Sequence, residues 1–423
     1  MLRFIPLPIA FAFALLPTCT WALKVTPLPL PIADNVAQPS VASDANGGFV
    51  VTWQQRLESG ASLHFAQLDA AGTIQRQGRI ARSQPDQTWF VNWADFPSLV
   101  VLDNGDWVTF WLQKRSQGTY AYDIHLTRSV DRGRNWSDSI LPHRDATASE
   151  HGFVSLVAAG ADRVLAIWLD GRNTGAATSG DAHDHDHGQG AGAMTLRSAI
   201  IDREGTISDE AEIDARTCDC CSTDAARIGN TTMLIYRDRS MDEIRDMNFS
   251  LRDRQGKWSA PHAVHADNWK IGGCPVNGPA LAVNDDHALA IWTTMQGDVL
   301  SVRSAIGNRN GFGRMIELER GARTLGRVDA TPWGKNKFLV SWVSGDSMTS
   351  AAETNTPSTE TTSIRLNVLD SRLKSVARAI IATLPKGANP GMPRIATSAT
   401  AAIAVWTESK AGTATSRAVL IRP

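Results

Sequence analysis

One sequence unit recurs seven times along the chain, and this repetition limits the folds that the chain can adopt. Each copy joins a short apolar strand through a tight turn to a β-branched strand that ends in an aromatic residue. These aromatic residues recur at intervals of 50 to 68 residues and are Trp53, Trp111, Trp168, Tyr236, Trp292, Trp342 and Trp406. Two further strands follow most copies, so each unit predicts a four-stranded antiparallel sheet. Such repetition is typical of an all-β, seven-bladed β-propeller, whereas a β-sandwich does not need so regular a period.

The two ends of the chain are expected to close this ring. The last unit supplies only three strands and finishes at residues 418–421, whereas residues 24–30 precede the first unit. Pairing of this N-terminal segment with the last strand would complete the final sheet and remove its exposed edge. We therefore predict a single propeller domain over residues 23–423.

Charge and the N-terminal segment bear on partners and compartment. The 423 residues carry 42 Lys and Arg against 43 Asp and Glu, which excludes a strongly basic nucleic-acid-binding protein and an acidic disordered tail. Residues 1–22 combine one basic residue, an apolar run and a small-residue end, a pattern typical of a secretory signal peptide. No later apolar run is long enough to span a membrane. We expect an exported protein, periplasmic or extracellular.

A turn in the second unit carries a recognisable motif. Ser129, Asp131, Gly133 and Trp136 stand in the pattern Ser-x-Asp-x-Gly-x-x-Trp, and residues 253–258 hold a weaker copy. In such a turn the Asp carboxylate accepts backbone N–H groups, the Gly takes a left-handed conformation and the Trp packs beneath. The motif specifies a fold rather than an activity.

This turn resembles the Asp-box of the sialidase-like superfamily, also called BNR-repeat proteins, and the resemblance extends over nearly the whole mature chain. A Cys-Asp-Cys-Cys stretch at residues 218–221 is similar to one found in an exported bacterial subgroup of sialidase-like proteins. The resemblance implies a propeller fold and a carbohydrate ligand. Since true sialidases have six blades, a six-bladed ring is the alternative to our count.

Successive connections in an antiparallel sheet alternate between its two ends, and this alternation (strand parity) places the unusual residues of the chain at one end of the ring. If Asp-box turns mark one end, the links between strands two and three, and between blades, lie at the other. Those links hold the residues that we predict to bind a ligand: Trp93, Asp95, His151, Arg172, Arg237, Arg239, Arg245 and Trp269. Arginine forks suit an anionic ligand, as in the arginine triad of sialidases. The alternative is that these arginines and their acidic neighbours neutralise one another in a structural network.

The resemblance also implies a set of catalytic groups. Sialidases use an Asp as acid and base, and a Tyr nucleophile activated by a Glu. The conspicuous candidates here are Tyr236 with Glu243, and Asp170 or Asp95 as the acid. The stretch that supplies the first triad arginine is absent near the N-terminus. Sialidase-type glycoside hydrolysis is therefore left open, beside a non-catalytic interaction scaffold.

The cysteines and histidines suggest a different function. Cys218, Cys220, Cys221 and Cys274 offer thiolates, and the run that contains His183, His185 and His187 offers imidazoles, which are ligands for copper or zinc. A periplasmic metal-binding protein is thus the alternative to a binder of anionic glycans or other small ligands, which requires no cofactor. Against metal, disulfides would consume the thiols, and we favour pairing of Cys218 or Cys221 with Cys274, because a bridge between adjacent cysteines is strained.

Overall fold

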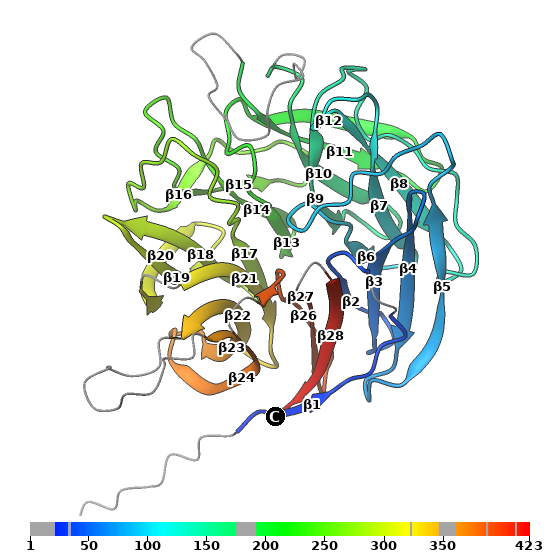
Figure 1. The fold of residues 1–423 in the computed structure, drawn as a ribbon. Coiled ribbons are helices and arrows are strands. Elements are labelled where there is room, and N and C mark those ends of the chain that lie inside the picture. Colours follow the sequence, from blue (N-terminus) through cyan, green and yellow to red (C-terminus); the bar gives the residue numbers. More distant parts are fainter. Residues whose placement is uncertain are drawn as a thin grey trace, which may run out of the picture.

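The computed structural model describes residues 22–32, 35–174, 192–321, 324–346, 361–385, 388–410 and 413–423. These residues form strands and loops, and seven sheets stand around a common axis (Figure 1). The seven-bladed propeller is therefore confirmed, and the six-bladed alternative is wrong. Nothing in this part of the chain forms a helix that could cross a bilayer. The histidine run and nearly all of the proposed signal peptide lie outside the described residues.

Each blade is an antiparallel sheet whose strands follow one another in chain order. Blades 1 to 3 consist of β2 (Ser40–Ser43), β3 (Phe49–Arg56), β4 (Ala61–Leu68), β5 (Ile74–Arg82), β6 (Leu99–Val101), β7 (Trp107–Lys114), β8 (Tyr122–Ser129), β9 (His151–Ala158), β10 (Val164–Asp170), β11 (Thr195–Ile201) and β12 (Ile207–Asp214). Blades 4 and 5 consist of β13 (Asp224–Ile228), β14 (Thr231–Arg237), β15 (Met247–Arg252), β16 (His262–His265), β17 (Ala280–Asn284), β18 (His287–Gln296), β19 (Val299–Asn308) and β20 (Gly311–Arg320). Blades 6 and 7 add β21 (Thr324–Pro332), β22 (Lys337–Asp346), β23 (Thr361–Asp370), β24 (Ser375–Pro385), β25 (Asn389–Pro390), β26 (Arg394–Thr397), β27 (Ala402–Lys410) and β28 (Thr413–Arg422).

The ring closes as the sequence predicts. Strand β1 (Lys24–Pro27) pairs antiparallel with β28, in a register that runs from Lys24 opposite Arg422 to Pro27 opposite Val419. The last blade therefore takes its outer strand from the start of the chain (Figure 1). Blade 2 has three strands, and a bridge between Leu126 and Ile140 stands where a fourth would lie. This closure leaves the last sheet without a free edge on β28.

The second strand of each blade forms the core, because both of its faces pack against neighbouring sheets. Every residue of β10 is buried, and the strand is apolar except at its end. Trp168 and Trp292, which end two of the sequence repeats, are fully buried between blades. Burial of one large apolar side chain contributes roughly 1.5–3 kcal/mol to stability. The β-branched runs and terminal aromatics of the repeat are thus the residues that hold adjacent blades together.

The turn that follows the third strand has one hydrogen-bonding pattern in several blades. In blade 2, Asn135 N donates to Asp131 Oδ1 at 2.9 Å, and Ser129 Oγ accepts from Gly133 N at 2.7 Å. The backbone N–H of Asn135 is the main cause that lowers the pKa of Asp131 to about 2. The same bond, from the N–H four residues later, is made by Asp69, Asp202, Asp253 and Asp370. These bonds have the geometry expected from the sequence motif.

Gly133 provides a test of this turn. Its φ is +82°, and an added Cβ would lie 2.7 Å from Phe65 Cζ and 2.9 Å from Trp107 Cζ3. We expect Gly133→Ala to lower the free energy of unfolding by roughly 1–3 kcal/mol through this overpacking, in addition to the cost of a left-handed alanine. Gly105→Ala is the matched control, because Gly105 has a φ of +87° and an open surrounding. Equal losses in urea unfolding of the two variants would contradict the packing argument.

Candidate functional site

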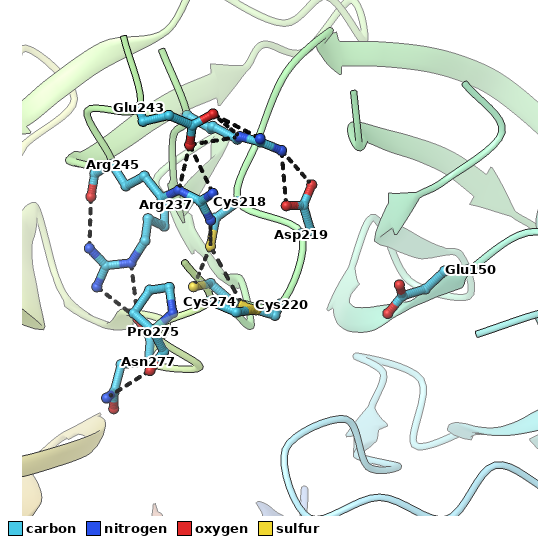
Figure 2. The surroundings of a disulfide bond; sticks show 12 residues. Glu150, Cys218, Asp219, Cys220, Arg237, Glu243, Arg245, Cys274, Pro275 and Asn277 are labelled. Carbon is cyan, nitrogen blue, oxygen red and sulfur yellow. Dashed lines mark hydrogen bonds and ion pairs between the residues drawn. A yellow bond between two sulfur atoms is a disulfide. The ribbon is translucent and has the colours of Figure 1, made fainter. Parts of the chain in front are cut away.

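Contacts join the loops at the end opposite these Asp turns. The link between blades 3 and 4 is tied to the link between blades 4 and 5 by a disulfide between Cys220 and Cys274. Arg239 Nη1 reaches Asp219 at 3.0 Å, and Arg245 Nη1 donates to Cys218 Sγ at 3.6 Å (Figure 2). The cysteine loop and the arginine-rich hairpin therefore meet at one end of the ring, as strand parity predicts.

The cysteine pairing differs from the expected one. Cys220 bonds to Cys274, whereas Cys218 and Cys221 are thiols whose sulfur atoms lie 2.6 Å apart. Our preference for Cys218 or Cys221 as the partner of Cys274 was wrong. The chain turns within the Cys-Asp-Cys-Cys stretch so that Cys218 and Cys221 point inward, with exposed fractions of 1% and 2%, while Cys220 stays partly exposed toward Cys274.

The two thiols differ in their acidity. Burial alone would raise the pKa of Cys218, but the hydrogen bond from Cys221, the charge of Arg237, the N–H of Cys220 and the charge of Arg245 lower it to about 7. Burial raises the pKa of Cys221, and its bond to Cys218 acts in the same direction. One thiol of the pair is thus readily ionised near neutral pH and the other is not.

The predicted anion-binding arginines already have partners. Arg239 makes three contacts to the carboxylate of Glu243 and Arg245 makes two, all within 3.2 Å. Arg172 donates two hydrogen bonds to the carboxylate of Asp170, from Nε at 2.8 Å and from Nη2 at 2.7 Å. These contacts correspond to the structural network that the sequence left as the alternative.

Arg237 is held by the backbone instead. Its guanidinium donates to the carbonyls of Asn277, Arg245 and Thr293, at distances from 2.7 to 3.2 Å, and lies 4.7 Å from the ring centre of Trp269. Arg237 is 2% exposed and Trp269 is 5% exposed. Both residues therefore hold the loop end together from within, and neither presents a surface to a ligand.

The structure does not bring the predicted catalytic residues together. The hydroxyl of Tyr236 donates to Asp214 Oδ2 at 2.6 Å, and burial is the main cause that raises its pKa far above the ordinary value. The carboxylate of Glu243 instead forms ion pairs with Arg239 and Arg245. Asp170 is fully buried between Arg172 and Trp168, whose indole donates to it at 2.8 Å. Burial alone would raise the pKa of Asp170, but the hydrogen bond from Arg172 keeps it low, so Asp170 is a poor proton donor.

A different tyrosine lies between two carboxyl groups. Tyr122 is the first residue of β8, Asp95 lies in the link from blade 1 to blade 2, and Glu150 immediately precedes β9. The Tyr122 hydroxyl is 3.0 Å from Asp95 Oδ2 and 2.7 Å from Glu150 Oε1. Asp95 Oδ1 also accepts the N–H of Phe153 at 2.8 Å. Asp95 and Tyr122 are buried, whereas Glu150 is partly exposed.

Both carboxyl groups are less acidic than usual. Burial raises the pKa of Asp95 to about 7, against the hydrogen bonds from Phe153 and Tyr122. Burial also raises the pKa of Glu150 to about 8, against the bond from Tyr122, and the charges of Asp95 and Asp219 add to the rise. Figure 2 shows Glu150 beside the loop of Asp219 and Cys220. Glu150 thus lies at the same end as the cysteine loop.

His151 belongs to a buried network behind this group. Its ring stacks on that of His143 at 3.8 Å between centres, and its Nε2 lies 3.1 Å from Asp145 Oδ1. Burial, followed by the charge of His143, lowers the pKa of His151. The imidazole nitrogens and carboxylate oxygens of this network are atoms that can bind a divalent metal. Arg172, whose Nη2 lies 3.5 Å from Asp145 Oδ1 and 2.7 Å from Asp170 Oδ2, supplies one positive charge to this network.

Trp93 is the predicted ligand residue that presents an open ring. It is 44% exposed and lies two residues before Asp95, with the guanidinium of Arg327 at 4.8 Å from its ring centre. A separate hollow of about 790 Å³ lies between blades 5 and 6, lined among others by Glu319, Trp342 and Arg365. That hollow lies away from the carboxyl and cysteine groups, and we do not assign it a reaction.

Sequence reasoning did not find Tyr122 and Glu150 as a pair. Asp95 and the neighbouring His151 were among the predicted residues, but Tyr122 and Glu150 were not. A signal existed, because Tyr122 is one of only three tyrosines and opens a strand at the loop-rich end. The sequence does not show that a link 28 residues later returns its carboxylate to this hydroxyl.

Comparisons with known proteins do not assign the chain to a family. No family model matches the chain, and no curated protein matches it. Among solved structures, a protein of unknown function from Dyadobacter fermentans is 12% identical, with 95% of this chain and 99% of that chain covered and a TM-score of 0.49. An α-L-arabinofuranosidase of Fusarium graminearum is 12% identical over 92% and 93%, with a TM-score of 0.46. A sialidase from Streptococcus pneumoniae is 8% identical over 92% and 68%, with a TM-score of 0.47.

Proposed function

We propose that the chain is a carbohydrate-active propeller that hydrolyses a glycosidic bond at its loop-rich end, with Glu150 as general acid. The observation that carries this proposal is the hydroxyl of Tyr122 between the carboxyl groups of Asp95 and Glu150. A tyrosine hydroxyl donates only one hydrogen. When it donates to one carboxylate, the second contact needs a hydrogen from the other carboxyl group, so the pair favours holding a proton.

Glu150 is the member of this pair that can pass its proton to a ligand. Asp95 and Tyr122 are buried, and Asp95 is fixed by the N–H of Phe153. Glu150 is partly exposed, and its pKa of about 8 keeps it protonated at neutral pH. A glycosidase acid needs this raised pKa and access to the glycosidic oxygen. Asp95 and Tyr122 then act as positioning residues.

The second carboxylate of the reaction is assigned to Asp219. Arg239 holds it through two contacts of 3.0 and 3.2 Å, which keeps the carboxylate oriented, and its charge acts on Glu150. Glycosidases pair a protonated carboxyl group with an ionised one across the scissile bond. Asp219 lies close enough for its charge to act on Glu150, and it is the carboxylate that we propose as base or nucleophile beside Glu150 as acid.

The ligand class follows from the aromatic surface and from the arginines. Sugar rings stack on aromatic faces, and Trp93 leaves part of its ring open in the loop that carries Asp95. The anionic preference predicted from the sequence rests on four arginines that already have partners, so we propose a glycan with no requirement for an acidic sugar. We also propose export, which the N-terminal pattern predicts and the Cys220–Cys274 disulfide supports.

A panel of fluorogenic glycosides, including neutral sugars and a sialoside, tests the proposal. We expect turnover of at least one glycoside at a rate that is highest near neutral pH, is halved near pH 8 and falls about tenfold for each further pH unit, because Glu150 must be protonated. The protein should first be shown to be folded by circular dichroism. Oligosaccharides of the same sugars should be tested as well. The proposal would be contradicted if the folded protein hydrolysed neither the fluorogenic glycosides nor these oligosaccharides.

A further inference from the structure

We infer that the four cysteines form a thiol–disulfide relay, in which the buried pair Cys218 and Cys221 exchanges with the outer disulfide Cys220–Cys274. The inference does not depend on the proposed hydrolysis. It rests on three sulfur positions at the loop-rich end. Cys218 Sγ lies 2.6 Å from Cys221 Sγ and 4.0 Å from Cys220 Sγ. Figure 2 shows Cys218 next to the disulfide of Cys220 and Cys274. One thiol thus contacts both its resolving partner and a sulfur of the existing disulfide.

The surroundings of Cys218 suit a nucleophile. The thiolate is the reactive form of cysteine, and neighbouring positive charge stabilises it. Arg245 Nη1 donates to Cys218 Sγ at 3.6 Å, and the charge of Arg237 also favours the thiolate. The N–H of Cys218 donates to the carbonyl of Arg237 at 3.1 Å, which fixes the loop against the end of β14. Cys221, with its raised pKa, stays a thiol until Cys218 becomes disulfide-bonded.

The exchange conserves atoms and electrons within the chain. The Cys218 thiolate attacks Cys220 Sγ, the Cys220–Cys274 bond breaks, and Cys274 leaves as a thiolate. Cys221, losing its proton to the released thiolate, then attacks Cys218 Sγ, which forms Cys218–Cys221 and releases Cys220. The chain begins and ends with one disulfide and two thiols. It ends with the thiols on Cys220 and Cys274, which are partly exposed.

The partly exposed thiols of Cys220 and Cys274 determine which class of substrate the relay can act on. Cys220 and Cys274 can reduce an external disulfide, forming their own bond again and releasing two thiols from the substrate. The buried pair then holds a disulfide, so the chain has passed on two electrons. A small or peptide disulfide that reaches the loop-rich end is therefore the substrate, and the inner cysteines act as the reservoir.

Disulfide mapping of a partly oxidised protein tests the relay. The protein is reduced with dithiothreitol, desalted under nitrogen, treated with one equivalent of oxidised glutathione, quenched in acid and mapped by mass spectrometry. We expect both Cys220–Cys274 and Cys218–Cys221 in wild type. Cys221→Ser should stop at the mixed disulfide Cys218–Cys220 and release Cys274 as a thiol. Cys218→Ser, the matched control, should retain Cys220–Cys274 alone.

A second measurement needs no variant: the rate at which the wild-type protein reaches its final mixture of the two disulfides. This rate should fall as the pH is lowered, because the thiolate is the form of cysteine that attacks a disulfide. The relay would be overturned if mapping found Cys220–Cys274 as the only disulfide in both wild type and Cys221→Ser at every pH. Tight binding of one equivalent of Zn²⁺ or Cu⁺ by the reduced protein, lost in Cys218→Ser, would also overturn it, in favour of the metal site that the sequence suggested.

Discussion

Replacing Glu150 by glutamine is expected to lower kcat/KM for the best glycoside by a factor of roughly 10²–10⁴, the usual contribution of a general acid. Glutamine keeps the shape of the side chain and can still accept the hydrogen of Tyr122, but it has no proton to give. Glu210→Gln is the matched control, because Glu210 is a partly exposed carboxylate on β12, the outer strand of blade 3, where it pairs with Arg144 and Arg172. The control should keep activity within about twofold of wild type.

Stability gives a second readout that separates loss of the acid from damage to the fold. Folding raises the pKa of Glu150 above its unfolded value, so its contribution to stability is present at low pH and is lost as the pH rises through about 8. Glutamine does not ionise. Glu150→Gln should therefore become more stable relative to wild type between pH 6 and pH 9, whereas Glu210→Gln should not. An active Glu150→Gln variant would contradict the assignment of the acid.

Replacing Arg237 by methionine is expected to destabilise the loop-rich end strongly. The side chain is 2% exposed and donates four hydrogen bonds to three carbonyls, which belong to the link between blades 4 and 5, the hairpin and strand β18. Methionine fills similar space but leaves these buried carbonyls without donors, a loss of roughly 3–5 kcal/mol in the free energy of unfolding. Urea denaturation followed by tryptophan fluorescence measures it.

Arg227→Met is the control for this substitution. The side chain of Arg227 is 46% exposed and pairs at 2.7 Å with Asp103, whose side chain is 54% exposed. Surface pairs of this kind contribute little, so its loss should stay within about 0.5 kcal/mol. If Arg237 instead bound an anionic ligand, Arg237→Met would weaken ligand binding and leave stability unchanged. That outcome would restore the role predicted from the sequence.

Much of the fold follows from the sequence because its determinants are local and repeated. The second-strand aromatics, such as Trp168, and the Asp turns, such as that of Asp131, specify a sheet without long-range information. Closure by residues 24–27 follows from counting strands in the last unit. Strand parity also gives the common end of the cysteine loop and the hairpin, which the contact of Arg245 with Cys218 shows.

The details of the site depend on side-chain partners that residue order does not reveal. The resemblance to sialidases implied Tyr236 with Glu243, yet the hydroxyl of Tyr236 donates to Asp214 from the preceding blade. Tyr122 instead meets carboxyl groups 27 residues before it and 28 residues after it. The cysteine pairing failed for a similar reason, because the direction of each side chain within residues 218–221 depends on the local turn. Residue types were therefore predictable, but their pairing was not.

The pKa of the Glu150 carboxyl group tests the central claim most directly. Infrared difference spectra of wild type against Glu150→Gln, recorded across a pH titration, isolate the carbonyl band of this one protonated carboxyl group. We predict that the band persists at neutral pH and disappears with a midpoint near pH 8. A midpoint near the ordinary value of about 4.3 would show an ionised Glu150 at neutral pH and would contradict its role as the acid.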